Sequence, residues 1–368
     1  MPQPFLVRLF LCVAAVCLVI QPASRARAAD KDETKKTKEY DDVKFDTVDQ
    51  VEIHGRFYSA GKKKAATILV LTKLGGDIRQ DGWDRLAEAL KKQGYSVLLF
   101  DFRGCGESKN ISPDFWKVAD NVTSIKGGPG NPVKATIDFK DFNKSYYPTL
   151  INDIAAARMF LDRRNDAGEC NSSDLILIGA EDGAALGMAW IYSEWYRFRL
   201  DGVGKLESGS EGRDVAGAVW LSYKRNVGSY SPYMDEWFRY VGREKKTPMA
   251  FVCGDGDKSG DELAQYWVNF MKKKEGKGDP GSKLTGFKAI DKADKVAGSE
   301  LLQKDLKTQE WIIEYIGKLM ESRGNSEWGQ REAKKIASVW SFPNTLRVAA
   351  KSRDSETLNL APLRLLFR

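Results

Sequence analysis

Two short apolar runs with a helical pattern between them constrain the fold of this chain most strongly. The runs are ATILVLT at residues 66–72 and YSVLLFDFRG at residues 95–104, and both are typical of buried strands. Between them, DRLAEALKKQG at residues 84–94 has apolar residues at helical spacing and ends on glycine. Since parallel strands joined by a helix make a right-handed crossover, the segment predicts an α/β fold with a mostly parallel sheet and helices on both faces.

Other segments continue this alternation of strands and helices. Strands are predicted at residues 51–60, 175–179, 216–223, 249–254 and 284–290, and helices at residues 147–164, after residue 179, and at residues 309–320. Residues 109–147 fit no such unit and form an insertion. It contains six aromatic residues at no regular spacing: Phe115, Trp116, Phe139, Phe142, Tyr146 and Tyr147. We expect a cap over the carboxyl ends of the strands, and the alternative is a disordered surface loop.

The first 28 residues have the pattern of a secretory signal peptide. Arg8 precedes the apolar run at residues 9–20, and Ala26 to Ala28 is an A-x-A cleavage site. Twelve apolar residues are short for a membrane span, so cleavage is expected and an uncleaved anchor is the alternative. The pattern predicts export to the periplasm, the extracellular space or the secretory pathway, without a stable membrane span after cleavage.

Charged segments flank the expected domain at residues 46–320. Residues 29–45 read as a solvated charged leader, and residues 321–368 as a basic tail. Candidate packing positions in the tail are Trp340, Phe342 and the PLRLLF that precedes Arg368. With 58 basic and 51 acidic residues, the chain has a mixed-charge surface that does not call for nucleic acid as a partner.

Cysteine usage points to neither a metal site nor a disulfide scaffold. After signal cleavage the chain keeps Cys105, Cys170 and Cys253, at wide spacing and without a ligand pattern. Export permits a disulfide without requiring one, so their pairing stays open. No metal and no cofactor are expected.

A strand ends and a helix begins within LILIGAEDGAALGMAW at residues 175–190. The turn Gly179-Ala180-Glu181-Asp182-Gly183 matches the G-x-S-x-G nucleophile elbow of serine hydrolases except at its centre, where Glu181 replaces serine.

Three further segments occur in the matching order. They are DFRGCGES at residues 101–108, the helix around Asp153, and GDGD at residues 254–257. Together with the elbow they resemble the α/β-hydrolase superfamily, most closely its dienelactone-hydrolase or small-esterase type, over about residues 46–320. We expect the DFRG loop to be architectural, with an internal ion pair, and the elbow glycines to be architectural as well.

The resemblance assigns the acid of a catalytic triad to Asp257, with Asp255 beside it. The histidine is expected in the loop after the strand that ends near residue 290, where Ala297-Gly298 stands instead. The chain's only histidine is His54, in the first predicted strand, and it is not expected to be the base. The triad is therefore degenerate.

Other nucleophiles fit poorly. In related dehalogenases and epoxide hydrolases a carboxylate stands at the elbow, but the resemblance then requires aspartate and a histidine that activates water. Cys105 has no evident base, and Asp182 could act only if the elbow were shifted by one residue. We expect Glu181 to lie within reach of Asp257 and the carboxylate pair to recruit a cation or a basic side chain.

These residues predict a binding or scaffold protein without hydrolysis, whose partner is a small molecule or another protein. The alternative is a hydrolase that acts on ester or acyl substrates through a non-standard site. Glycines after the first buried strand supply backbone N–H groups that could surround an anion, or else form a plain turn. The expected binding residues are Glu181, Asp182, Asp255, Asp257, Gly75 and Gly76.

Overall fold

A computed structural model describes the fold. The described residues are 38–80, 82–200, 206–230, 234–273, 281–324, 326–331, 340–341 and 361–362. The predicted signal peptide at residues 1–28 and most of the predicted tail lie outside them.

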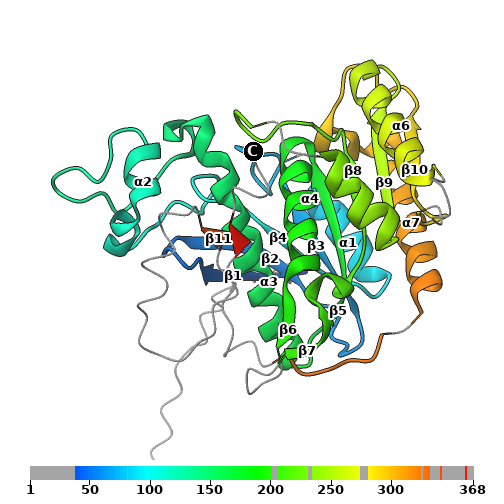
Figure 1. Cartoon of the computed structure of the whole chain (residues 1–368), viewed down its shortest axis with the longest axis horizontal. Helices are drawn as coiled ribbons and strands as arrows, with labels where there is room; N and C mark the ends of the chain where they lie inside the picture. The colour runs from blue at the N-terminus through cyan, green and yellow to red at the C-terminus, as the bar shows by residue number, and fades with distance from the viewer. Residues whose placement is uncertain are drawn as a thin grey trace, which may run out of the picture. The chain divides into compact units, whose positions relative to one another are not determined.

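The described fold is built on a mixed sheet of eight strands (Figure 1). They are β1 (Asp41–Asp46), β2 (Glu52–Tyr58), β4 (Ser96–Phe100), β3 (Ala66–Leu71), β5 (Asn171–Ala180), β8 (Val215–Leu221), β9 (Met249–Gly254) and β10 (Gly286–Ile290), in spatial order. The β1–β2 and β2–β4 pairs are antiparallel, and all later pairs are parallel. The predicted α/β class is confirmed.

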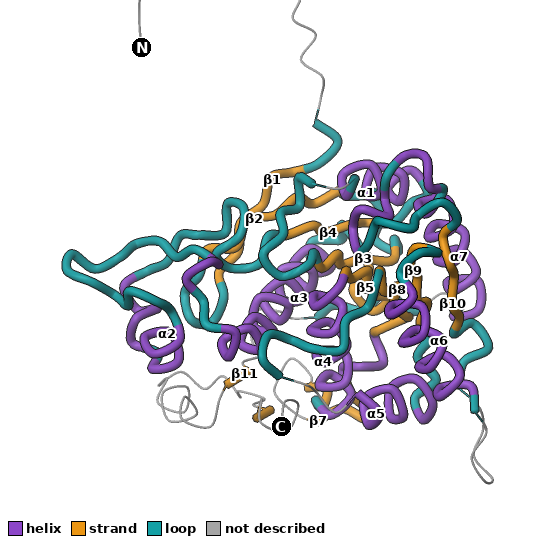
Figure 2. The backbone as a smooth tube through the Cα atoms, turned by 90° about the horizontal axis from the view of Figure 1, so that it is seen from above, coloured by secondary structure: helices purple, strands orange, loops and turns teal. Residues whose placement is uncertain are grey.

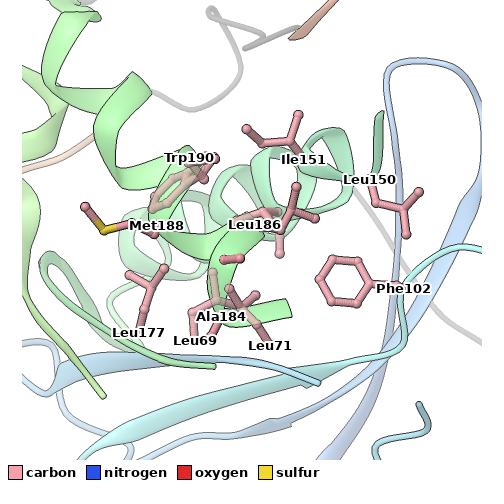
Figure 3. Packing of buried hydrophobic residues seen from close by; sticks show 14 of the residues in the cluster. Leu69, Leu71, Phe102, Leu150, Ile151, Leu177, Ala184, Leu186, Met188 and Trp190 are labelled. Carbon is pink, nitrogen blue, oxygen red and sulfur yellow. The ribbon is translucent and has the colours of Figure 1, made fainter. Parts of the chain in front are cut away.

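Helices cover both faces of this sheet. The described helices are α1 (Trp83–Lys92), α2 (Ala119–Ser124), α3 (Ile151–Asp166), α4 (Glu181–Tyr196), α5 (Met234–Trp237), α6 (Lys258–Lys272) and α7 (Thr308–Arg323). One core includes residues of α3, α4 and α6, and a second core lies under α1 and α7. Figure 3 shows Ala184 of α4 above Leu69 and Leu71 of β3 in the first core. Ile68 and Val70 point into the second core, so β3 is buried on both faces.

The chain enters the sheet earlier than the charge pattern indicates. Residues 41–46 of the predicted solvated leader form β1, in which Val43 and Phe45 are buried while their neighbours are exposed. The Phe45 ring stacks on Phe160 of α3, with ring centroids 5.1 Å apart. The boundary at residue 45 is therefore wrong, because two apolar side chains in alternation suffice to bury one face of an edge strand.

The predicted tail also begins with residues that belong to the fold. α7 continues to Arg323, and the Asn165 amide donates a hydrogen bond of 2.9 Å to the Gly329 carbonyl. Arg331 forms an ion pair with Asp214. Farther along, β11 (Trp340–Ser341) pairs in parallel with β12 (Ala361–Pro362).

The insertion at residues 109–147 is folded against the domain. Its helical turns are η1 (Pro113–Lys117), α2, η2 (Phe139–Asp141) and η3 (Lys144–Leu150), and all six aromatic residues are buried or pack against the core. Near its end, the Phe139 ring lies against Gly75, just beyond β3. The first half of the insertion contacts another part of the fold: the Asn121 amide donates a hydrogen bond to Asp49 in the β1–β2 connection. Figure 2 shows α2 beyond the β1 and β2 side of the sheet, so only the second half reaches the strand ends near the elbow.

Several described elements lie outside the predicted ones. A hairpin of β6 (Phe198–Leu200) and β7 (Leu206–Ser210) follows α4, and a π-helical turn, η5 (Phe238–Glu244), follows α5. Between the hairpin and β8 lies the turn η4 (Glu211–Asp214). None of the described helices has both the length and the apolar content that a membrane crossing requires.

Candidate functional site

The turn between β5 and α4 has the backbone geometry of a nucleophile elbow. Ala180 is extended, and Glu181 takes a φ of 51°, which is uncommon for a residue with a side chain. A Cβ atom at Gly183 would lie 1.9 Å from the Thr72 carbonyl oxygen, and one at Gly179 would lie 2.8 Å from the Ala184 Cα. The architectural role predicted for both glycines is confirmed.

The carboxylate of Glu181 is held by lysine side chains. Glu181 is 9% exposed, and its Oε2 forms an ion pair with Lys224 Nζ. Lys73 Nζ lies 4.0 Å from Oε1, and the Lys224 backbone N–H donates to the Glu181 carbonyl at 3.3 Å. Lys224 follows β8, the strand beside β5, so the order of the sheet brings it to the elbow.

Asp182 connects the elbow to the loop after β3. Its Oδ1 accepts a hydrogen bond of 2.9 Å from the Leu74 backbone N–H. Burial raises the pKa of Asp182, while the bond from Leu74 and the charge of Lys224 act in the opposite direction. In a G-x-S-x-G hydrolase, an N–H of this loop and the N–H after the nucleophile form the oxyanion hole. Here that loop N–H already binds an anion, the carboxylate of Asp182.

The two candidate glycines shape the same loop. Gly75 has a φ of 82°, and a Cβ there would lie 2.9 Å from the Phe139 ring. The Gly76 N–H donates to the Lys73 carbonyl at 2.9 Å. Gly76 therefore closes a tight turn, in agreement with the plain-turn alternative, while Leu74 supplies the N–H that meets an anion.

The predicted acids bind backbone groups of their own region. Asp257 caps α6 by accepting from the Gly260 N–H at 2.9 Å, and Asp255 accepts from the N–H groups of Lys292 and Ala293, each at 2.9 Å. Asp257 is thus engaged at the start of α6, and the basic group beside the elbow, Lys224, pairs with Glu181 alone.

The loop that carries the histidine in the resembling family does reach the elbow. A Cβ added to Gly298 would lie 2.6 Å from Glu181 Oε1, so this residue packs against the carboxylate. Ala297 precedes it in extended conformation, at the start of the turn η6 (Gly298–Leu302). The chain thus places Ala297 next to the glycine that touches Glu181 and offers no imidazole there.

His54 and Cys105 lie in environments that do not suit a base or a nucleophile at the elbow. His54 Nε2 lies 2.8 Å from Glu52 Oε1, and β2 is separated from β5 by β4 and β3, which corresponds to about 14 Å. Cys105 is buried, and burial raises the pKa of its thiol well above the ordinary value. Neither group meets the requirements of a base or nucleophile at the elbow.

The DFRG loop holds the ion pair predicted for it. The Arg103 guanidinium is fully buried and lies 2.7 Å from Asp153 Oδ1 and 2.6 Å from Asp49 Oδ2. It also donates to the Tyr146 hydroxyl at 2.8 Å, which fastens the end of the insertion. The loop is a structural joint between β4, α3 and the insertion.

Lys73 and Lys224 are the site residues that sequence reasoning missed. Lys224 comes three residues after a wholly buried strand, and Lys73 comes two residues after another. A charged side chain just beyond the carboxyl end of a central strand is a usable signal, because such ends border the ligand site in this architecture. In the described part of the chain, no three His, Cys, Asp or Glu side chains gather as a metal site.

No protein-family model and no curated protein matches the chain. Among solved structures, a Pyrococcus furiosus esterase is similar to it with 14% identity and a TM-score of 0.50, over 77% of this chain and 92% of the esterase. The protein DcsB, solved in complex with its substrate analogue, is similar with 12% identity and a TM-score of 0.50, over 76% of this chain and 98% of DcsB. A dienelactone hydrolase from Anabaena variabilis gives 12% identity and a TM-score of 0.46, over 77% of this chain and 99% of that enzyme. From the first two likenesses and the strand order, this chain has the α/β-hydrolase fold.

Proposed function

We propose that this protein is an exported binding or scaffold protein that uses the α/β-hydrolase fold without hydrolysing esters. Its ligand is a small molecule or another protein. The proposal of export rests on Arg8, the apolar run at residues 9–20 and the A-x-A site that ends at Ala28.

The hydrogen bond from the Leu74 N–H to the Asp182 carboxylate carries the proposal. Ester hydrolysis passes through a tetrahedral oxyanion, and the hydrolase stabilises it with N–H groups that are free to receive it. In this chain the loop N–H donates to a carboxylate that the protein itself provides. A substrate oxyanion would have to displace Asp182 and would meet its negative charge.

The positions of nucleophile and base support the same conclusion. Glu181 is neutralised by Lys224, and the loop beside it offers Ala297 where an imidazole would be needed. General-base catalysis alone is worth roughly 100- to 10,000-fold in rate, so its loss removes most of the turnover. The backbone shape of the elbow remains because the close contacts of Gly179 and Gly183 require it.

Ester hydrolysis is the activity to exclude, since one of the similar structures is an esterase. The purified chain is treated with a fluorophosphonate probe and assayed with short-chain nitrophenyl esters, beside the variant Glu181→Ala. We expect no labelling and turnover no faster than that of an unrelated protein at the same concentration. The same background is expected for the variant.

Two outcomes would contradict the proposal. Turnover at ordinary enzymatic rates that disappears in Glu181→Ala would make Glu181 a catalytic residue. Turnover that persists in Glu181→Ala would support the alternative, a hydrolase for ester or acyl substrates with a non-standard site elsewhere.

A further inference from the structure

A cavity of about 340 Å³ lies at the end of α4 that is remote from the elbow. It is lined by Trp195, Tyr196, Gly209, Ser210, Arg213, Tyr240 and Lys245. Fourteen residues of helix separate Glu181 from Trp195, which corresponds to about 21 Å. Figure 2 shows β7 and α5 near α4 in this region. The cavity is therefore distinct from the site at the elbow, and its volume is in the range that holds small ligands.

One wall of the cavity is aromatic. The rings of Tyr196 and Tyr240 stack with centroids 4.9 Å apart and an angle of 18° between their planes. Tyr192 packs against both rings, and its hydroxyl bonds to Tyr196 at 3.2 Å and to Glu236 at 2.7 Å, which fixes the cluster. Tyr196 is nevertheless 51% exposed. A fixed, exposed ring is a surface against which a ligand ring can stack at little cost in conformational entropy.

The other wall is cationic. Lys245 Nζ lies 5.4 Å from the centroid of the Trp195 ring and 4.8 Å from that of Tyr240. Within the described residues it has no carboxylate partner. Arg213 lines the same cavity, and none of the lining residues is acidic. The Lys245 ammonium thus gives the cavity a positive charge that attracts a negative group.

Two glycines keep the cationic and aromatic groups in place. Gly209 has a φ of 126°, and a Cβ there would lie 2.5 Å from the Arg213 guanidinium. A Cβ at Gly212 would lie 2.5 Å from the Trp195 ring. Any side chain at these positions would push Arg213 or Trp195 out of the present arrangement.

Three acidic side chains of the neighbouring turns pair with groups other than Lys245. Glu244 forms an ion pair with Arg239, and Glu236 accepts from Tyr192. Glu211 lies 4.0 Å from Arg331. These three acids therefore have partners other than Lys245.

We infer that this cavity binds a small ring-bearing anion, such as a phosphate, sulfate or carboxylate attached to an aromatic or sugar ring. The ring of the ligand packs on Tyr196 and Tyr240, and its anionic group meets Lys245. In the free protein the Lys245 ammonium rests on the aromatic rings, and it turns toward the anion when the ligand binds. This inference does not depend on the chemistry at the elbow.

Phenyl phosphate is the probe that combines both features, and phenol and inorganic phosphate each carry one of them. Their affinities for the full chain are measured by isothermal titration calorimetry at low ionic strength. We expect phenyl phosphate to bind at least tenfold more tightly than either phenol or inorganic phosphate. Lys245→Met keeps the aliphatic stem and removes the charge, and should weaken binding about tenfold.

The matched control is Lys117→Met, which removes the same charge from a lysine whose side chain is 73% exposed in the insertion. It should leave the affinity unchanged. Lys224→Met distinguishes the two sites: a loss of phenyl phosphate binding in this variant, with unchanged binding in Lys245→Met, would place the anion at the elbow and overturn the inference. Absence of phenyl phosphate binding at millimolar concentration would overturn it as well, and would leave Lys245 as an internal partner of the rings.

Discussion

Removing the carboxylate of Asp182 should restore an oxyanion hole that the native chain keeps occupied. The starting point is the double variant Glu181→Ser, Ala297→His. It supplies a nucleophile at the elbow and an imidazole next to Gly298, the residue that contacts position 181. The Leu74 N–H donates to Asp182 at 2.9 Å in the native chain, and we expect this bond to persist in the double variant. Adding Asp182→Ala frees this N–H and also the N–H of residue 182 itself, which bonds to the same carboxylate. One oxyanion donor is worth about 100- to 1,000-fold in kcat, so the triple variant should exceed the double variant by at least about 100-fold.

The assay is the initial rate of nitrophenyl acetate hydrolysis, with a fluorophosphonate label to count active serines. Asp182→Asn in the same background is the matched control, because its amide oxygen can still accept from Leu74 and its gain should be much smaller. Equal rates in the double and triple variants, with both labelled and folded by circular dichroism, would refute the argument that Asp182 blocks the oxyanion site.

The remaining predictions concern stability and processing. Burial raises the pKa of Glu194 from 4.5 to about 7. Between these two pH values the folded state holds a proton that the unfolded state has lost. The free energy of unfolding should therefore fall by about 3 kcal/mol from pH 4.5 to pH 8. Urea titrations should give a flatter pH dependence for Glu194→Gln, and an identical slope would contradict this assignment. Gly183→Ala should cost about 3 kcal/mol or more because of its contact with Thr72, whereas Gly317→Ala, in open space on α7, should be neutral or stabilising; equal melting temperatures would argue against the elbow contact. Mass spectrometry of protein from the native host should find the N-terminus beside Ala28, and an intact Met1 on soluble cytoplasmic protein would exclude export.

The elbow and the DFRG loop were predictable because their requirements are local. The glycines at positions 179 and 183 are required by a turn of five residues, and Arg103 stands three residues after the end of β4, in a loop where an internal ion pair is expected. The residues that contact these motifs from other strands depend on the order of the strands in the sheet. That order places β8 beside β5, which brings Lys224 to Glu181, although 43 residues separate them.

Other differences arise where composition hides a pattern. β1 lies in a run of charges, yet its alternation buries two side chains. α6 was outside the predicted elements although Ala264, Trp267 and Met271 have helical spacing and are buried. The aromatic cavity has no local signal, because Trp195, Arg213 and Lys245 come from three segments that meet only after the hairpin folds back on α4.

The three buried thiols can report local unfolding of the regions in which they lie. Cys105, Cys170 and Cys253 are all free and buried, and burial raises the pKa of each of them, to about 12 for Cys170 and Cys253. A chain that starts after residue 28 carries no other cysteine. Alkylation of these thiols therefore requires a local or global unfolding event. The three alkylation rates, measured by peptide mass in a single native sample, would compare how often the loop after β4, the start of β5 and the end of β9 open.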